Sequence, residues 1–148
     1  MLKVCEQCDA FLPTSSPTLC SHDPHCSHFS VSTGAVYYYQ RSSDDDGRYE
    51  FVQKIMSKER EVLDQFGGYN RHLAVDSNGD MVAIATHGDH WTSRSVHIFV
   101  KYKNHWEEVA IVDAPPNSTH FGEDILISQD KLLISSWKNT YSYKLNCL

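Results

Sequence analysis

Short runs of apolar residues, separated by polar turns, fill most of the chain. Residues 72–76 and 81–86 ("HLAVD" and "MVAIAT") are almost continuously apolar, which is typical of strands covered on both faces. Residues 95–101 alternate between apolar and polar positions, as a strand with one solvated face does. Residues 49–55 and 106–112 are more polar still. The pattern therefore predicts an all-β chain whose strands range from doubly covered to half-solvated.

The strand-rich part of the chain also repeats itself. The aligned segments are residues 64–86 with 119–136, 34–40 with 94–100, and 49–55 with 106–112, and residues 139–145 begin the second of these a third time. The first alignment places the pair Phe66-Gly67 over the pair Phe121-Gly122. The copies lie 55 to 60 residues apart. A repeat on this scale indicates stacked supersecondary units, in the range of propeller blades.

Strand order and turns refine this prediction. The segment "DSNGD" (76–80) supplies a tight hairpin turn, because Asn-Gly accepts the positive φ angles that such turns need. We expect a partial β-propeller-like stack of antiparallel four-stranded blades, about two blades, over residues 34–145. An irregular Cys/His-rich segment (1–33) precedes it and a short tail (146–148) follows. Closed propellers usually have four to eight blades, so two indicate a fragment, or a chain that closes with further blades or by self-association.

The repeated pattern resembles a known family. Phe-Gly, two apolar strands, a loop and then Gly-x-Val-Tyr-x-Tyr are similar to the FG-GAP repeat, which forms the β-propeller of integrin α chains. The Phe-Gly half is present in both copies, whereas Ala85-Thr86-His87 and Ser135-Ser136-Trp137 replace Gly-Ala-Pro. The resemblance implies an extracellular or cell-surface binding protein. The family's calcium-binding loop is missing from this sequence, so calcium is not expected.

Composition and charge exclude several classes of protein. The chain has 148 residues, 41% of them apolar, which suits one folded domain. Its net charge of −6 and scattered basic residues argue against nucleic-acid binding. No segment approaches the roughly 20 apolar residues of a membrane helix. The start, "MLKVCEQCDAFLP", lacks the apolar core of a signal peptide, which indicates an intracellular protein or a piece of a longer one.

Four of the five cysteines lie within the first 26 residues. Cys5 and Cys8 form a C-x2-C pair, and Cys20 and Cys26 follow among three histidines. Structural zinc takes four thiolate or imidazole ligands, and two close pairs can supply them. The second pair has no standard spacing. Disulfides and free thiols therefore stay open beside a candidate zinc site.

The remaining chemistry favours binding over catalysis. The sequence contains no G-x-S-x-G, no H-E-x-x-H and no glycine-rich phosphate loop, so we expect no enzyme. Loops of a rigid β scaffold are where binding residues gather. We expect His87, Asp89, His90 and Trp91 in one loop, with Trp137 from the next unit, to contact a protein or glycan partner. The alternative is a small zinc-binding protein that uses the N-terminal cluster.

Metal analysis separates the two functions. The zinc alternative predicts about one zinc ion per purified chain, because structural sites hold their metal tightly. Changing both Cys5 and Cys8 to Ser should then abolish the bound zinc. Zinc content that is negligible, or that survives both changes, would contradict the alternative.

Overall fold

The computed structural model describes residues 2–5 (backbone only), 34–42, 47–58, 66–67, 72–86 and 95–145. The strands in these ranges are β1 (Leu2–Cys5), β2 (Ala35–Arg41), β3 (Tyr49–Ile55), β4 (Leu73–Val75), β5 (Met81–Ala85), β6 (Ser95–Tyr102), β7 (His105–Asp113), β8 (Ile125–Ser128), β9 (Lys131–Ser135) and β10 (Thr140–Lys144). The described ranges contain no α-helix. They also contain no helix that is long and apolar enough to span a membrane.

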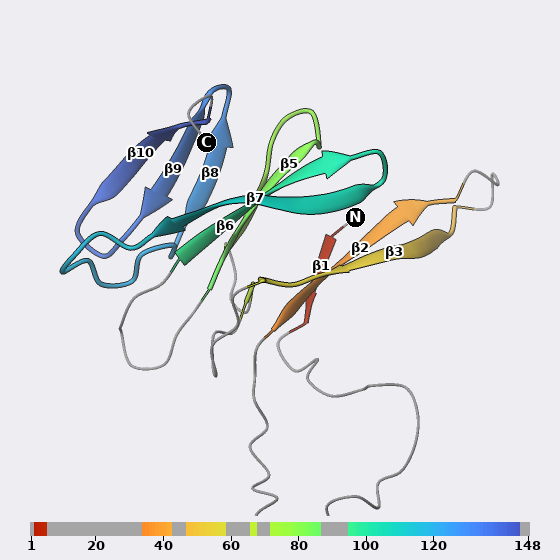
Figure 1. Ribbon diagram of the computed structural model, residues 1–148, viewed down its shortest axis with the longest axis horizontal. Coiled ribbons are helices and arrows are strands. Elements are labelled where there is room, and N and C mark those ends of the chain that lie inside the picture. Colours follow the sequence, from red (N-terminus) through yellow and green to blue (C-terminus); the bar gives the residue numbers. More distant parts are fainter. Residues whose placement is uncertain are drawn as a thin grey trace, which may run out of the picture.

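The strands form three antiparallel sheets, shown in Figure 1. Sheet A has the order β1-β2-β3, sheet B the order β4-β5-β6-β7, and sheet C the order β10-β9-β8. Sheet B lies between the other two (Figure 1). The prediction of an all-β chain with antiparallel sheets is confirmed. The expected number of units differs, because three sheets are present and only sheet B has four strands within the described residues.

Strand β1 lies inside the segment that was expected to be irregular. It pairs with β2 from Leu2↔Tyr38 to Cys5↔Ala35. The expectation of irregular structure is therefore wrong for Leu2–Cys5. Four residues are too few to show the alternation of apolar and polar positions that marks a strand. The cysteine- and proline-containing sequence that follows does not extend such an alternation.

Sheet B is covered on both faces, as its continuous apolar strand predicts. Val82 and Ile84 of β5 belong to a buried cluster shared with sheet A, whereas Ala83 and Ala85 belong to a cluster shared with sheet C. Successive side chains of a strand point to opposite faces, so one apolar run serves both gaps. The A/B cluster contains Val36, Tyr38, Ile55, Phe66, Val82, Ile84, Phe99 and Trp106. The B/C cluster contains Ala83, Ala85, Val96, Ile98, Val112, Phe121, Ile127, Leu132 and Ile134.

The two Phe-Gly pairs lie at corresponding places in the two gaps. Phe66 is buried between sheets A and B and Phe121 between sheets B and C, each with 1% of its surface exposed. Each ring makes edge-on contacts with aromatic neighbours, such as Phe66 with Phe99 at 6.0 Å and Phe121 with Tyr141 at 5.6 Å. A large ring therefore fills each gap just before the first strand of the following sheet.

The backbone around the glycines repeats as well. The N–H of Gly67 donates to the carbonyl of Ala85 at 2.9 Å, and the N–H of Gly122 donates to the carbonyl of Ser135 at 2.9 Å. The alignment pairs Ala85 with Ser135. Both glycines have positive φ angles, 72° and 85°, which glycine adopts without steric cost. The same turn thus leads into the inner strands of sheets B and C.

A β-bulge also recurs at aligned positions. The β2–β3 register shifts between Tyr38 and Tyr39, and the β6–β7 register shifts between Ile98 and Phe99. The alignment pairs Tyr38 with Ile98 and Tyr39 with Phe99. Because bulges bend and twist strands, the shared bulge gives the outer strands of sheets A and B the same curvature.

The "DSNGD" segment forms the hairpin turn between β4 and β5. One carboxylate oxygen of Asp76 accepts the N–H groups of Asp80 and Met81, both at 2.9 Å. Gly79 has a φ angle of 75°, as the turn requires. The Asp76 side chain is therefore part of the turn and closes it from within.

Substitution of two glycines tests how closely sheets B and C approach. A Cβ atom at Gly122 would lie 2.9 Å from the Cβ of Ala85 and 3.4 Å from a methyl carbon of Val96. A Cβ at Gly79, which also has a positive φ angle, would meet nothing within 4 Å. We expect Gly79→Ala to lower the free energy of unfolding by about 1 kcal/mol and Gly122→Ala by about 2–4 kcal/mol. Urea denaturation measures both, and equal losses would contradict the close approach.

Candidate functional site

Trp137 is the expected binding residue that the structure places in full. It follows β9 and is 71% exposed. Its ring meets the His120 ring edge-on at 5.5 Å, and its backbone N–H donates to the carbonyl of Thr119 at 3.2 Å. The turn beside it is closed by Ser136, whose N–H donates to the carbonyl of Asn139 at 2.8 Å. The indole is thus exposed to solvent on a turn that backbone hydrogen bonds order, with one edge against His120.

The other expected binding residues, His87, Asp89, His90 and Trp91, lie outside the described residues. The two residues that flank their segment are described: the N–H of Thr86 donates to the carbonyl of Ser95 at 2.9 Å. This bond matches the bond between Ser136 and Asn139 in sheet C. The adjoining ends of β5 and β6 are therefore joined in sheet B as the ends of β9 and β10 are joined in sheet C.

The candidate zinc ligands are placed only in part. Cys5 ends β1, whereas Cys8, Cys20 and Cys26 lie outside the described residues. Within the described ranges, no group of three or more His, Cys, Asp or Glu side chains could hold a metal ion.

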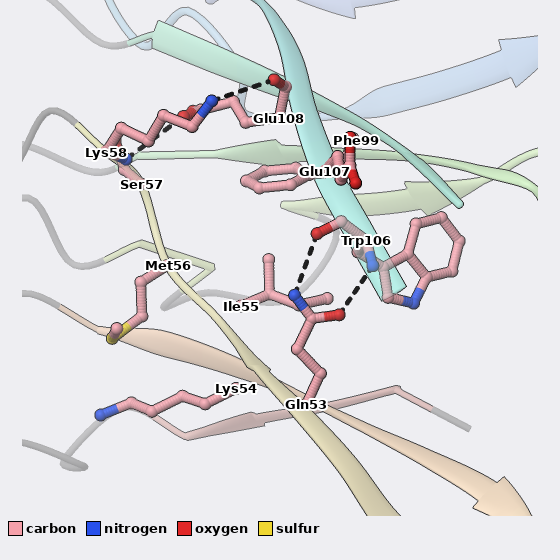
Figure 2. Close-up of a pocket in the computed structure, with 10 residues that line it drawn as sticks. All are labelled: Gln53, Lys54, Ile55, Met56, Ser57, Lys58, Phe99, Trp106, Glu107 and Glu108. Atoms are coloured by element: carbon pink, nitrogen blue, oxygen red, sulfur yellow. Dashed lines mark hydrogen bonds between the residues drawn. The ribbon is translucent and has the colours of Figure 1, made fainter. Parts of the chain in front are cut away.

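A cleft of about 440 Å³ opens between sheets A and B. It is lined by Gln53, Lys54, Ile55, Met56, Ser57, Lys58, Phe99, Trp106, Glu107 and Glu108. Figure 2 shows Gln53 of β3 reaching across to the backbone of Trp106 on β7. The amide of Gln53 donates to the Trp106 carbonyl at 2.9 Å, and its oxygen accepts the Trp106 N–H at 2.7 Å. The Gln53 side chain therefore joins sheets A and B with the pair of backbone hydrogen bonds that a neighbouring strand would make.

A second connection crosses the cleft at Glu108. The backbone N–H of Lys58 donates to one carboxylate oxygen of Glu108 at 3.2 Å, and the Lys58 amine donates to the Glu108 carbonyl at 3.4 Å (Figure 2). The other carboxylate oxygen lies 2.6 Å from Nδ1 of His97. Both side chains of this pair are almost fully buried, at 3% and 5% exposure. The carboxylate thus has partners on both oxygens.

The hydrogen-bond chain continues beyond His97. Its Nε2 lies 2.9 Å from the Ser95 hydroxyl, which lies 3.2 Å from the Thr86 hydroxyl. A carboxylate only accepts, so Nδ1 of His97 donates to Glu108, while Nε2 meets the Ser95 hydroxyl. This network was not predicted from the sequence, although a histidine among the apolar residues of a buried strand was a visible signal.

Ser95, His97 and Glu108 form a hydrogen-bonded series of serine, histidine and carboxylate. Hydrolases with a nucleophilic serine use the same series. Here the imidazole is enclosed: His97 is 2% exposed, and the Phe66 ring packs edge-on against it at 5.5 Å. A general base has to reach the proton it removes, and this ring meets other side chains on its faces. The arrangement holds β6, β7 and the segment after β3 together.

The cleft itself has little free polar chemistry. The amide of Gln53 and the carboxylate of Glu108 are used in joining the sheets, while Glu107 is exposed beside them. The Nε1 atom of Trp106 is buried without a hydrogen-bond partner, and its ring meets Tyr38 edge-on at 5.8 Å. The polar side chains of the cleft therefore serve contact between sheets A and B.

Two adjacent glutamates give a matched test of the buried network. Glu108→Gln removes the charge from a carboxylate with two partners, whereas Glu107→Gln changes an exposed side chain of the same strand. We expect Glu108→Gln to lower the free energy of unfolding by about 1–3 kcal/mol and Glu107→Gln by less than about 0.5 kcal/mol. Urea denaturation at neutral pH measures both. Equal values would show that the network contributes no stability.

No family model, no curated protein and no solved structure matches this chain. Its function is therefore inferred from its own residues and their geometry.

Proposed function

We propose that this chain is a non-catalytic recognition module, built as a propeller-like stack of sheets, that binds a protein or a glycan through its loops. The loops concerned follow the second strand of a sheet, after β5 and after β9. The turns at residues 76–80 and 129–130 lie at the opposite ends of the same strands. One end of the stack thus serves recognition.

The Trp137 turn is the observation on which this proposal depends. An indole with 71% of its surface exposed offers a large apolar area that a partner can bury. The backbone bond to Thr119 orders the turn and the His120 ring supports the indole, so less conformational entropy is lost when a ligand binds. Tryptophan is among the residues that dominate binding energy at interfaces, and its flat face also suits contact with a sugar ring.

The stacked sheets support the scaffold part of the proposal. Equivalent Phe-Gly turns, equivalent hydrogen bonds and an equivalent bulge relate successive sheets. Repetition of one unit with a constant offset is how propellers hold their loops on a common rim. Loops supported in this way are suited to binding, because the scaffold beneath them does not need to move.

The test first identifies a ligand and then measures how much Trp137 contributes to its binding. The purified chain is screened against a glycan array and a panel of purified extracellular proteins, and each hit is titrated. We expect a saturable ligand whose dissociation constant rises about 30-fold in Trp137→Ala, which corresponds to loss of a hot spot worth about 2 kcal/mol.

Tyr102→Ala is the matched control. Tyr102 is 59% exposed at the β6–β7 turn, which lies at the other end of sheet B. Its loss should leave the affinity unchanged. A screen without a saturable ligand, or equal weakening by the two variants, would argue against the proposal.

A further inference from the structure

Sheet A turns an aromatic face away from sheet B. Tyr49 and Phe51 of β3 are 53% and 56% exposed, and Tyr37 and Tyr39 of β2 are partly exposed beside them. The Phe51 ring lies 6.1 Å from Tyr37 and 5.8 Å from Tyr39. These four residues, the A face, form a continuous patch of rings. Surfaces of this kind mark sites of association.

The repeat shows what normally happens to such a face. The alignment pairs Tyr39 with Phe99 and Tyr49 with Trp106. Phe99 and Trp106 are 3% and 4% exposed, because sheet A covers them. Sheet B therefore buries rings at the positions where sheet A exposes them. A further sheet packed on the A face would complete the pattern.

The chain also carries a surface suited to that role, on the outer side of sheet C (Figure 1). This C face consists of Leu126, Leu133, Ser135, Thr140 and Ser142. By strand register, the corresponding positions in sheet B are Ala74, Ala83, Ala85, Val96 and Ile98, which pack against sheet C. Leu126 is 55% exposed. The C face thus carries small or aliphatic side chains at the positions that, in sheet B, contact the large residues of the following sheet.

Charge also favours this pairing. Lys131 and Lys144 pair in register at the edge of the C face, and both are exposed. Ammonium groups are attracted to the faces of aromatic rings. The A/B gap already contains such a contact, in which the Lys101 amine lies 5.1 Å from the centre of the Tyr38 ring.

We propose that two copies of this chain associate head to tail, with the A face of each copy packed against the C face of the other. The proposal rests on the propeller-like arrangement of the proposed function and adds the partner that completes it. Two copies of three sheets make six, which lies within the four to eight blades of closed propellers. A head-to-tail contact gives a closed assembly only when the repeated rotation returns to the first copy. Two copies related by a two-fold axis meet this condition and form two identical interfaces.

The first experiment measures mass in solution under reducing conditions, which exclude disulfide-linked dimers. Light scattering or native mass spectrometry of the full chain should show a dimer at micromolar concentration. Phe51→Asp and Leu126→Asp each place an unpaired charge in the interface at an exposed position. Each should raise the dissociation constant at least about 100-fold, while far-ultraviolet circular dichroism stays unchanged. Tyr102→Asp, away from both faces, should remain dimeric.

Mixing the two variants tests the head-to-tail geometry. In a mixed dimer, the intact C face of Phe51→Asp meets the intact A face of Leu126→Asp, so one of the two interfaces is restored. We expect a heterodimer from two monomeric variants. A monomeric wild type, a dimer insensitive to Leu126→Asp, or a mixture without heterodimer would overturn the proposal.

The dimer and the proposed recognition function can be tested independently of each other. Trp137→Ala should remain dimeric, because Trp137 belongs to neither face. A monomeric wild type that still binds its ligand through Trp137 would leave the recognition function intact and remove only the dimer.

Discussion

Strand β5 is buried on both of its faces, and this constraint shapes the whole structure. Val82 and Ile84 point into one gap, and Ala83 and Ala85 point into the other. A strand with no solvated face cannot exist in an isolated sheet, because each bare apolar face would lose the free energy gained by burial. Sheet B therefore requires a sheet on either side. The three-sheet stack follows from five consecutive apolar residues.

The difference in size between the two faces of β5 determines how closely the sheets approach. The alanines allow the Phe121-Gly122 turn to come so near that a Cβ on Gly122 would collide with Ala85. The larger Val82 and Ile84 share the other gap with Phe66 and with Tyr38 of sheet A. Large residues on one face and small ones on the other let each sheet fit against the next.

The periodicity and repetition of apolar residues predicted most of the strands. The residue types that carry chemistry predicted little of the candidate functional site. The strands from Ala35 onward follow alternating or continuous apolar runs, so local pattern was enough to find them. Strand β1 was missed because Leu2–Cys5 is too short for a pattern and depends on pairing with β2. Trp137 was visible as an aromatic residue in a loop.

The buried network could not be read from the sequence for a different reason. Ser95 and His97 are neighbours on one strand, but Glu108 comes from the next strand and meets His97 only through the β6–β7 register. The shared bulge shifts that register and sets which residue of β7 lies beside β6. Spacing along the chain does not reveal such a shift, because the bulge needs no particular residue.

The proposed assembly and the proposed recognition would use different directions of the same scaffold. Sheet faces are directed along the stack, whereas the turn after β9, which carries Trp137, lies at one end of the strands. In the proposed dimer, the two copies share the axis that relates successive sheets, which would place both Trp137 side chains at the same end of the strands. Two equal sites on one rim turn the second binding event into an intramolecular one. A weak contact made by one exposed indole then suffices for tight binding to a partner that presents repeated features, such as a glycan with several equal branches.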